Sequence, residues 1–264
     1  MTLQYHLKIG KGDIAPYILL PGDPGRVKKV AEYWDEARLV AENREYITYT
    51  GTYKGAPISC TSTGIGCPST AIAMEELARC GAHTFIRIGT CGAFQDHIRS
   101  GDIAIFDSAM RLDGTSHLYA PAEYPAVANY EVINACIKAL DKLGYVGHVG
   151  TTRTSDAFYA RRPAKGSSFG DFDQSNWKYH FDDLKKLNVL ASEMEASIIM
   201  VLARIWGLRA GGMAAVLHNI MGVEKDSDAF DPEVDMDYSA NYIERLAIAG
   251  CESILALYEE DKLK

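Results

Sequence analysis

Two glycine-containing segments of the sequence carry arginines at places where a small anion could bind. The first, Pro21–Val27, follows the apolar run Tyr17–Leu20. Gly22 lets the backbone approach a bound group closely, Asp23 can cap a helix that begins at the next proline, and Arg26 offers a planar guanidinium. Since a helix start favours phosphate, this segment indicates an anion site. Taken alone, it is equally compatible with a strand–turn–helix corner that binds nothing.

The second segment, Arg87–Ala93, is predicted to be a turn after the strand-like run Thr84–Ile88. Arg87 ends an otherwise apolar run, Thr90 could add a hydroxyl donor, and the glycines could expose backbone N–H groups. Ligands gather at the carboxyl ends of strands, so both segments are expected to face one crevice. Because a buried arginine is costly alone, a partner carboxylate explains Arg87 as well as a ligand does.

Other segments are less specific. Thr63–Thr70 is rich in glycine and enters a predicted helix, but it lacks the lysine of a P-loop and does not match G-x-G-x-x-G. Nucleoside triphosphate and NAD sites are rejected on that ground. Arg44 is predicted in a hairpin strand, where a solvated charge is the ordinary explanation.

Two carboxylates, Glu193 and Glu195, lie in Ser192–Ser197, which is predicted to begin a helix that is almost wholly apolar over Ile198–Ile205. Acidic residues in a first turn interact favourably with the helix N-terminus. A carboxylate can also accept hydrogen bonds from the adjacent hydroxyls of a sugar. Both interpretations are open from the residues alone.

Composition limits the classes of protein that need be considered. The chain has 264 residues, 47% of them hydrophobic, which suits one α/β domain over residues 1–264. A net charge of -8 argues against binding to nucleic acid or an acidic membrane, although arginines can still converge on a small anion. The six cysteines show no zinc spacing, and no run suits a signal peptide or a membrane span, so a cytoplasmic protein is expected.

Apolar runs that suit buried strands alternate with helical patterns, which predicts a sheet with flanking helices. The expected strands are Tyr17–Leu20, Ile58–Ser62, Thr84–Ile88, Ile103–Phe106, Val146–Thr151 and Met213–Leu217. The expected helices are Thr70–Cys80 after a cap at Ser69, Val132–Leu143 before Gly144, and a last helix with an apolar stripe from Ile243 to Leu257. Arg161–Trp177 is predicted to be a long loop.

Five segments together resemble, in order and spacing, the nucleoside phosphorylase family that contains uridine phosphorylases and hexameric purine nucleoside phosphorylases. They are Pro21–Val27, Asn43–Tyr46, Thr63–Gly66, Arg87–Ala93 and Ser192–Glu195, and the resemblance covers nearly the whole chain. It implies a single-domain fold with a central mixed β-sheet flanked by helices. It also implies cleavage of a nucleoside by inorganic phosphate, with no cofactor and no metal, in a homo-oligomer built from dimers, namely a hexamer.

The resemblance assigns residues to phosphate and ribose. The implied phosphate site is Gly22, Arg26, Arg44, Arg87 and Thr90, with Arg44 from a neighbouring subunit; the implied ribose site is Thr90, Met194 and Glu195, with His6 from that subunit. The catalytic residues would be Arg26, Arg87 and Glu195. Phosphate is then the nucleophile, and negative charge from phosphate and carboxylate stabilises the oxocarbenium-like sugar.

The base is less well defined. The implied base-binding residues are Cys91, Gly92, Phe158, Arg162, Lys165, Glu193 and Asn219. Many purine-cleaving members have an aspartic acid at the position of Asn219, so the asparagine here favours a pyrimidine substrate. However, the glutamine and arginine that follow Phe158-Tyr159 in uridine phosphorylases are absent from this sequence. Arg162 or Lys165 is the candidate replacement donor, while Cys91 resembles purine-cleaving relatives. Uridine or deoxyuridine is therefore expected, with a purine nucleoside phosphorylase as the alternative and a catalytically silent nucleoside-binding protein as another class.

Overall fold

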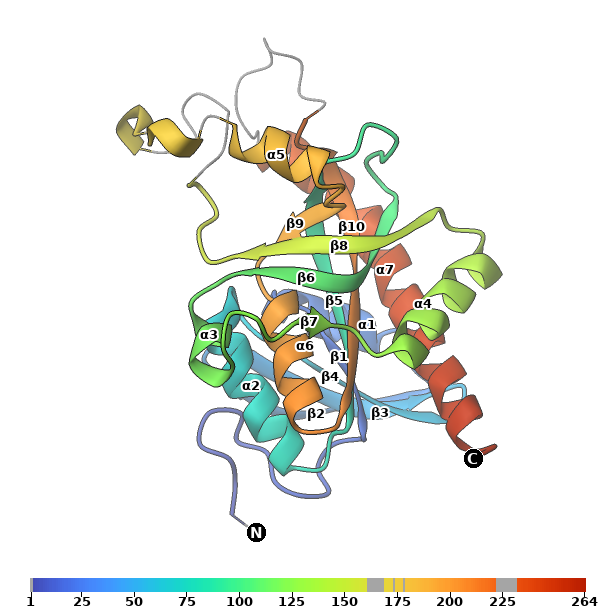
Figure 1. Ribbon diagram of the computed structural model, residues 1–264. Helices are drawn as coiled ribbons and strands as arrows, with labels where there is room; N and C mark the ends of the chain where they lie inside the picture. The colour runs from blue at the N-terminus through green and yellow to red at the C-terminus, as the bar shows by residue number, and fades with distance from the viewer. Residues whose placement is uncertain (1, 161–168, 173, 178, 222–231) are drawn as a thin grey trace.

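The computed structural model describes residues 2–160, 169–172, 174–177, 179–221 and 232–264, and over them a mixed sheet is flanked by helices (Figure 1). The strands are β1 (Tyr17–Leu20), β2 (Glu36–Asn43), β3 (Tyr46–Tyr53), β4 (Ala56–Thr61), β5 (Thr84–Ala93), β6 (Ile103–Leu112), β7 (Ala126–Val127), β8 (Gly147–Ser155), β9 (Ala191–Glu193) and β10 (Arg209–Asn219). The helices are α1 (Pro24–Ala31), α2 (Cys67–Arg79), α3 (Thr115–Tyr119), α4 (Tyr130–Leu143), α5 (His180–Lys186), α6 (Ala196–Ile205) and α7 (Pro232–Asp261). The predicted fold class is confirmed.

The sheet closes on itself at one end. Its strand order is β10-β6-β8-β9-β5-β1-β4-β3-β2, with β7 beside β6, and β10 also pairs with β5. Strands β5, β10, β6, β8 and β9 therefore form a closed ring, while β1, β4, β3 and β2 extend from β5 as an open sheet. β1 runs parallel to β4 and β5, whereas β9 runs antiparallel to β5.

An opening lies along one edge of β5. β1 pairs with β5 only as far as Leu20 beside Arg87, and β9 joins the same strand where Ser192 pairs with Gly92. No strand of the described chain occupies that edge over the intervening residues 88–91. This interruption, at the carboxyl end of a parallel strand, is where an α/β sheet accommodates a ligand.

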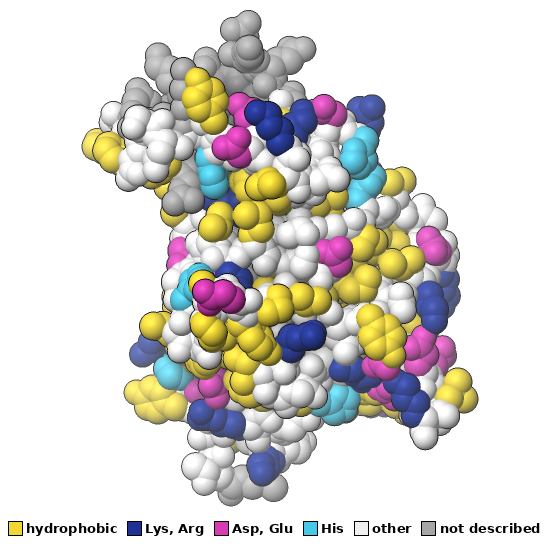
Figure 2. Space-filling view, viewed as in Figure 1, with side chains coloured by type: hydrophobic (Ala, Val, Ile, Leu, Met, Phe, Trp, Pro, Cys, Tyr) yellow, Lys and Arg dark blue, Asp and Glu magenta, His cyan; other side chains and the backbone are white. Residues whose placement is uncertain are grey.

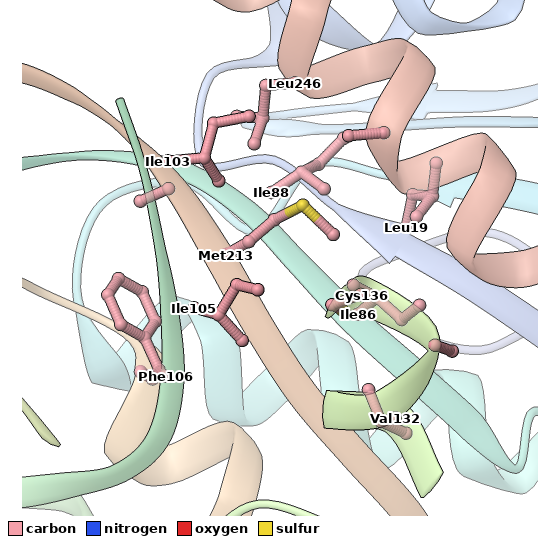
Figure 3. Close-up of a cluster of buried hydrophobic side chains, with 14 of the residues drawn as sticks. Leu19, Ile86, Ile88, Ile103, Ile105, Phe106, Val132, Cys136, Met213 and Leu246 are labelled. Carbon is pink, nitrogen blue, oxygen red and sulfur yellow. The ribbon is translucent and has the colours of Figure 1, made fainter. Parts of the chain in front are cut away.

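Helices bury both faces of the sheet. Alternate residues of a strand point to opposite faces, so Leu19 packs toward α4 and α7 while Ile18 and Leu20 pack toward α2 and α6. Figure 3 shows the first of these clusters, in which residues of β1, β5, β6 and β10 meet helices α4 and α7. Its labelled members are Leu19, Ile86, Ile88, Ile103, Ile105, Phe106, Val132, Cys136, Met213 and Leu246. Both clusters support the strands that end at the opening.

Several predicted strands are longer in the structure than in the sequence pattern. Tyr17–Leu20 is confirmed to the residue, but β5 continues through Ala93, so the prediction of a turn over Arg87–Ala93 was wrong. The physical reason is that β10 pairs with β5 from Thr84 to Ala93 and keeps the glycines extended. Likewise β8 does not end at Thr151 and continues to Ser155.

Local signals at helix ends were partly right. Asp23 caps α1 through a 2.8 Å bond from the N–H of Gly25, as predicted. Ser69 is not the cap of α2, because the helix begins two residues earlier and the Ser69 hydroxyl donates to the carbonyl of Ile65. The segment that begins at Ser192 is first a strand, β9, and α6 starts only at Ala196.

Two further expectations concern surface segments. Arg44 lies in the turn between β2 and β3, with a positive φ of 55°, so the hairpin is confirmed but the arginine is outside its strands. Within the predicted loop Arg161–Trp177, the described part contains two short 3-10 turns, Phe169–Asp171 and Ser175–Trp177.

Among the helices described, none has both the length and the apolar character to cross a bilayer.

Charged side chains tie the last helix to the rest of the fold. Figure 2 shows side chains of both signs gathered over the end of α7, where Arg209 bonds to Glu131 and Asp261. Deeper in α7, the buried Glu252 accepts from Tyr53 at 2.8 Å and from Lys142 at 2.7 Å. Burial favours the neutral acid, but hydrogen bonds from lysines and this tyrosine outweigh it and lower the pKa of Glu252 to about 2.

Glu252→Gln should lower the free energy of unfolding by about 1–3 kcal/mol at pH 7, because Lys54, Lys142 and Tyr53 lose a charged acceptor. Since the pKa is depressed on folding, this contribution is complete above pH 4.5 and is lost as the pH falls toward 2. Urea denaturation at fixed protein concentration should therefore show the two proteins converging below pH 4.5. Glu260 is only partly buried and pairs with the exposed Lys138, so Glu260→Gln should cost less than about 1 kcal/mol. Equal losses in both variants would contradict this account.

Candidate active site

A cavity of about 930 Å³ opens at the interruption along β5. Its walls come from the turn between β1 and α1, the second half of β5, the ends of β8 and β10, and the segment that joins β9 to α6. These are carboxyl ends of neighbouring strands, so residues far apart in sequence meet here. The predicted convergence of the Gly22 and Arg87 segments is thereby observed.

Arg26 gives the cavity a cation that the described residues do not neutralise fully. Its Nε is buried and has no hydrogen-bond partner among the described residues. The carboxylate oxygen nearest to this nitrogen, Oδ2 of Asp23, is 3.7 Å away. Burial lowers the pKa of Arg26, Asp23 raises it, and the like charge of Arg87 lowers it further. A guanidinium in this setting is suited to an incoming anion.

Arg87 is fully buried between two carboxylates. Its Nε lies 2.7 Å from Oε2 of Glu193, and its Nη2 lies 2.5 Å from Oε2 of Glu195. Burial alone would lower the pKa of Arg87, but the charges of Glu195 and Glu193 outweigh it and raise the pKa. Nη1 is also buried and has no hydrogen-bond partner among the described residues. Arg87 thus has the partner carboxylates expected of a structural arginine and one nitrogen left for a ligand.

Gly89 makes room for this arrangement. A Cβ built at Gly89 would lie 2.7 Å from Nη2 and 2.8 Å from Cζ of Arg87. The guanidinium therefore folds back along its own strand into the space that the glycine leaves. A side chain at this position would displace the end of Arg87 while leaving the backbone of β5 unaffected.

Glu195 joins the two glycine-rich segments across the cavity. Its Oε1 accepts from the backbone N–H of Gly66 at 2.6 Å, and its Oε2 contacts Arg87. Burial raises the pKa of Glu195, Arg87 lowers it, and the neighbouring charge of Glu193 raises it again, with a net rise. Glu195 lines the cavity together with Met194 and Thr90, so all three predicted ribose contacts from this chain lie there.

Glu193 is committed to internal contacts. Its Oε2 accepts from the N–H groups of Glu195 and Ala196 at 2.8 Å each, and its Oε1 accepts from the hydroxyl of Thr154 at 2.5 Å. The carboxylate therefore caps α6 and holds Arg87, which confirms the helix-terminus interpretation for Glu193. Glu193 also lines the cavity, and its predicted contact with the base stays a prediction.

Some predicted base contacts lie at the cavity and others do not. Cys91, Gly92 and the half-exposed Phe158 line it. Burial and the charge of Glu193 raise the pKa of Cys91, and the charge of Arg87 offsets this only in part. The thiol is therefore neutral, and it lines the cavity without acting as a nucleophile. Arg162 and Lys165 lie outside the described residues.

Asn219 and two residues expected to act across a subunit boundary are placed away from the cavity of this chain. The Asn219 amide donates to the carbonyls of Gln95 and Ile98, so it fastens a neighbouring loop. His6 contacts Glu76 through Nδ1 at 2.8 Å, and Arg44 is exposed in its hairpin turn. None of the three lines the cavity formed by the described residues.

The sequence pattern missed Arg153, a buried arginine in the cavity wall. Its Nη1 donates to the Ser192 hydroxyl and its Nη2 to the Ser155 hydroxyl, both at 2.9 Å. The guanidinium lies 5.6 Å from the centre of the Phe181 ring. Because the strand was predicted to end at Thr151, Arg153 fell in an unassigned segment; only its pairing with β6 and β9 brings it into the cavity. His218 is a second cavity residue that the pattern missed.

The family model described as "Phosphorylase superfamily" matches residues 16–253. The chain belongs to the phosphorylase superfamily. It is 52% identical over 219 residues to a uridine phosphorylase from Thermococcus kodakarensis, a match that covers 82% of this chain and 78% of the relative. It is 40% identical over 232 residues to a guanosine phosphorylase from Halorubrum lacusprofundi, covering 88% and 90% of the two chains.

A solved structure extends this similarity to the phosphorylase fold. A crystal structure of uridine phosphorylase from Vibrio fischeri superposes with a TM-score of 0.82 at 30% sequence identity, covering 97% of this chain and 98% of that one. The resemblance carried by the five sequence segments is thus confirmed at the level of the family and the fold.

Gly89→Ala should weaken binding of inorganic phosphate by about tenfold or more, because the new methyl group displaces the Arg87 guanidinium. The clash is with the end of a side chain and not with backbone, so the variant should remain folded, with a lower free energy of unfolding because Arg87 shifts from Glu193 and Glu195. Calorimetric titration with phosphate measures the affinity, and thermal unfolding checks the fold. Gly150→Ala is the matched strand control, since its Cβ would meet Leu190 only at 3.4 Å. Unchanged phosphate affinity in Gly89→Ala would exclude the proposed role of the glycine.

Proposed function

We propose that this single-domain chain catalyses phosphorolysis of a nucleoside, uridine or deoxyuridine above all, to free base and (deoxy)ribose 1-phosphate in nucleoside salvage. The observation that carries the proposal is the pair of arginines, Arg26 and Arg87, each with a buried nitrogen that the described residues leave unbonded, beside the buried carboxylate of Glu195. A hydrolase that uses water has no need of two such cations. Inorganic phosphate is the co-substrate, and no cofactor or metal is required by this scheme.

The phosphate would be held by Gly22, Arg26, Arg87 and Thr90 beneath the anomeric carbon of the sugar. Positioning and charge then supply the catalysis, since the phosphate oxygen is itself the nucleophile. As the new C–O bond forms, the glycosidic C–N bond breaks and its electron pair leaves with the base. Glu195 accepts a hydrogen bond from a ribose hydroxyl and, with the phosphate, stabilises positive charge on the sugar.

Two residues outside the cavity are assigned to a second copy of the chain. We place Arg44 at the phosphate and His6 at the sugar of a neighbouring subunit, in a homo-oligomer built from dimers, as a hexamer. This assignment is supported by the exposed turn that carries Arg44 and by the similarity to uridine phosphorylases. We also place the enzyme in the cytoplasm, supported by six free and buried thiols.

The preference for uridine rests on relatives named uridine phosphorylase from Thermococcus kodakarensis and Escherichia coli. Cys91, Gly92 and Phe158 would form part of the base pocket, with the Phe158 ring stacked on the base. A purine nucleoside such as inosine, guanosine or adenosine is the second candidate. It is favoured by the relative named guanosine phosphorylase.

Arg26→Gln should lower kcat/KM for phosphate by about a hundredfold, because a charged contact to the nucleophile is lost. The fold should tolerate the change, since no described residue hydrogen-bonds to the Arg26 guanidinium Nε. Initial rates at varied phosphate concentration give the measurement. Arg79→Gln on α2 removes an exposed arginine and should leave the rates unchanged. Wild-type rates in Arg26→Gln would rule out the proposed phosphate site.

Product analysis tests the reaction itself and the base. The protein is incubated with uridine, thymidine, inosine or adenosine, with and without phosphate, and the base and sugar products are separated. Phosphate-dependent release of uracil with ribose 1-phosphate is expected. Release that does not need phosphate would identify a hydrolase, release of purines alone would favour the second candidate, and no release would indicate a nucleoside-binding protein.

A further inference from the structure

Four residues form a row across the closed end of the sheet. Neighbouring strands pair His218 of β10 with Gly92 of β5, Gly92 with Ser192 of β9, and Ser192 with Arg153 of β8. Arg153 donates to the Ser192 hydroxyl, and a Cβ on Gly92 would lie 3.2 Å from Nε2 of His218, so these groups share one face. All four residues line the cavity.

This row lies at the opposite end of the cavity from the phosphate clamp. On β5, Arg87 pairs with the end of β1, from which Gly22 and Arg26 follow, whereas Gly92 lies five residues farther along. Five extended residues span roughly 17 Å. Thr90 and the Met194–Glu195 segment lie between, where the sugar would bind. A nucleoside whose anomeric carbon faces the phosphate therefore places its base against the row.

The Arg153 guanidinium is held in a fixed position at that end. The hydroxyls of Ser192 and Ser155 accept from its two terminal nitrogens, and the ring of Phe181 lies 5.6 Å from its centre. These contacts orient the guanidinium. Arginine is a donor only, so the atom that it meets on a base must be an acceptor, such as a ring carbonyl oxygen. An exocyclic amino group at the same place would bring two donors together.

We propose that Arg153 is the specificity-determining residue for the base: it donates to a carbonyl oxygen and selects oxo bases over their amino counterparts. Ser155 and Ser192 act as positioning residues that fix the guanidinium. The same contact favours the reaction, because the electron pair of the broken glycosidic bond is delocalised onto that oxygen as the base leaves. This inference rests on the proposed phosphorolysis, and it assigns to Arg153 the role that the sequence suggested for Arg162 or Lys165.

The test compares matched nucleosides that differ in one group, uridine with cytidine and inosine with adenosine, in the presence of phosphate. Wild-type protein should favour the oxo member of each pair. Arg153→Gln should lower kcat/KM for uridine by 10-fold to 100-fold and reduce the uridine-to-cytidine ratio at least tenfold, because the glutamine amide can also accept from an amino group. The KM for phosphate should change less than twofold. Arg204→Gln, an exposed arginine on α6, is the control and should change neither quantity.

A double variant, Ser155→Ala with Ser192→Ala, keeps Arg153 and removes only the two hydroxyls that orient it. It should lower the uridine-to-cytidine ratio of kcat/KM by a smaller factor than Arg153→Gln does. If Arg153→Gln fails to fold, the ratio measured for this double variant decides the test. An unchanged ratio in the folded variants, or a wild-type preference for cytidine and adenosine, would overturn the proposal. If wild-type protein releases no base with phosphate from any of the four nucleosides, the proposed function itself fails. Phosphorolysis with an unaffected ratio would refute only the role of Arg153.

Discussion

The ion pair of Arg87 with Glu193 and Glu195 is the interaction on which the site and its surroundings depend. It joins β5 to β9, and Glu193 in turn caps α6 while Glu195 holds the N–H of Gly66 ahead of α2. Charges buried this deeply are stable only while each keeps its partners, and removal of one partner typically costs about 3–5 kcal/mol. The contacts that organise the fold here are therefore the same contacts that orient the candidate catalytic groups.

The sheet explains why these charges meet at a cavity. β5 exchanges one neighbour for another along its length, with β1 ending beside Arg87 and β9 beginning beside Gly92, while β10 supports the opposite edge throughout. The backbone between them stays extended and leaves one edge open. Gly89 lies in this stretch, and its missing side chain lets the guanidinium turn back into the opening. Topology and residue type thus create the space and the charge at one place.

Local signals were sufficient wherever a few consecutive residues decide the structure. Asp23 before a proline predicted the start of α1, and Gly144, with a left-handed φ of 68°, ends α4 as expected. The extension of β5 to Ala93 was beyond such signals, because its cause is a strand more than a hundred residues away in sequence. Arg153 was missed for the same reason: two distant strands bring it to the cavity, and nothing in its neighbouring residues indicates this.

Three arginines line the cavity among the described residues, and they differ in the groups that contact them. Arg87 is balanced by carboxylates, Arg26 has its nearest carboxylate oxygen 3.7 Å away, and Arg153 bonds to serine hydroxyls. Arg26 and Arg153 lie toward opposite ends of the cavity, and the carboxylate of Glu195 lies between them. Phosphorolysis needs this sequence of charge, because the nucleophile and the departing base carry negative charge while the sugar between them becomes positive. The sheet register places the groups in that order, so the proposed direction of the bound nucleoside follows from the strand pairing.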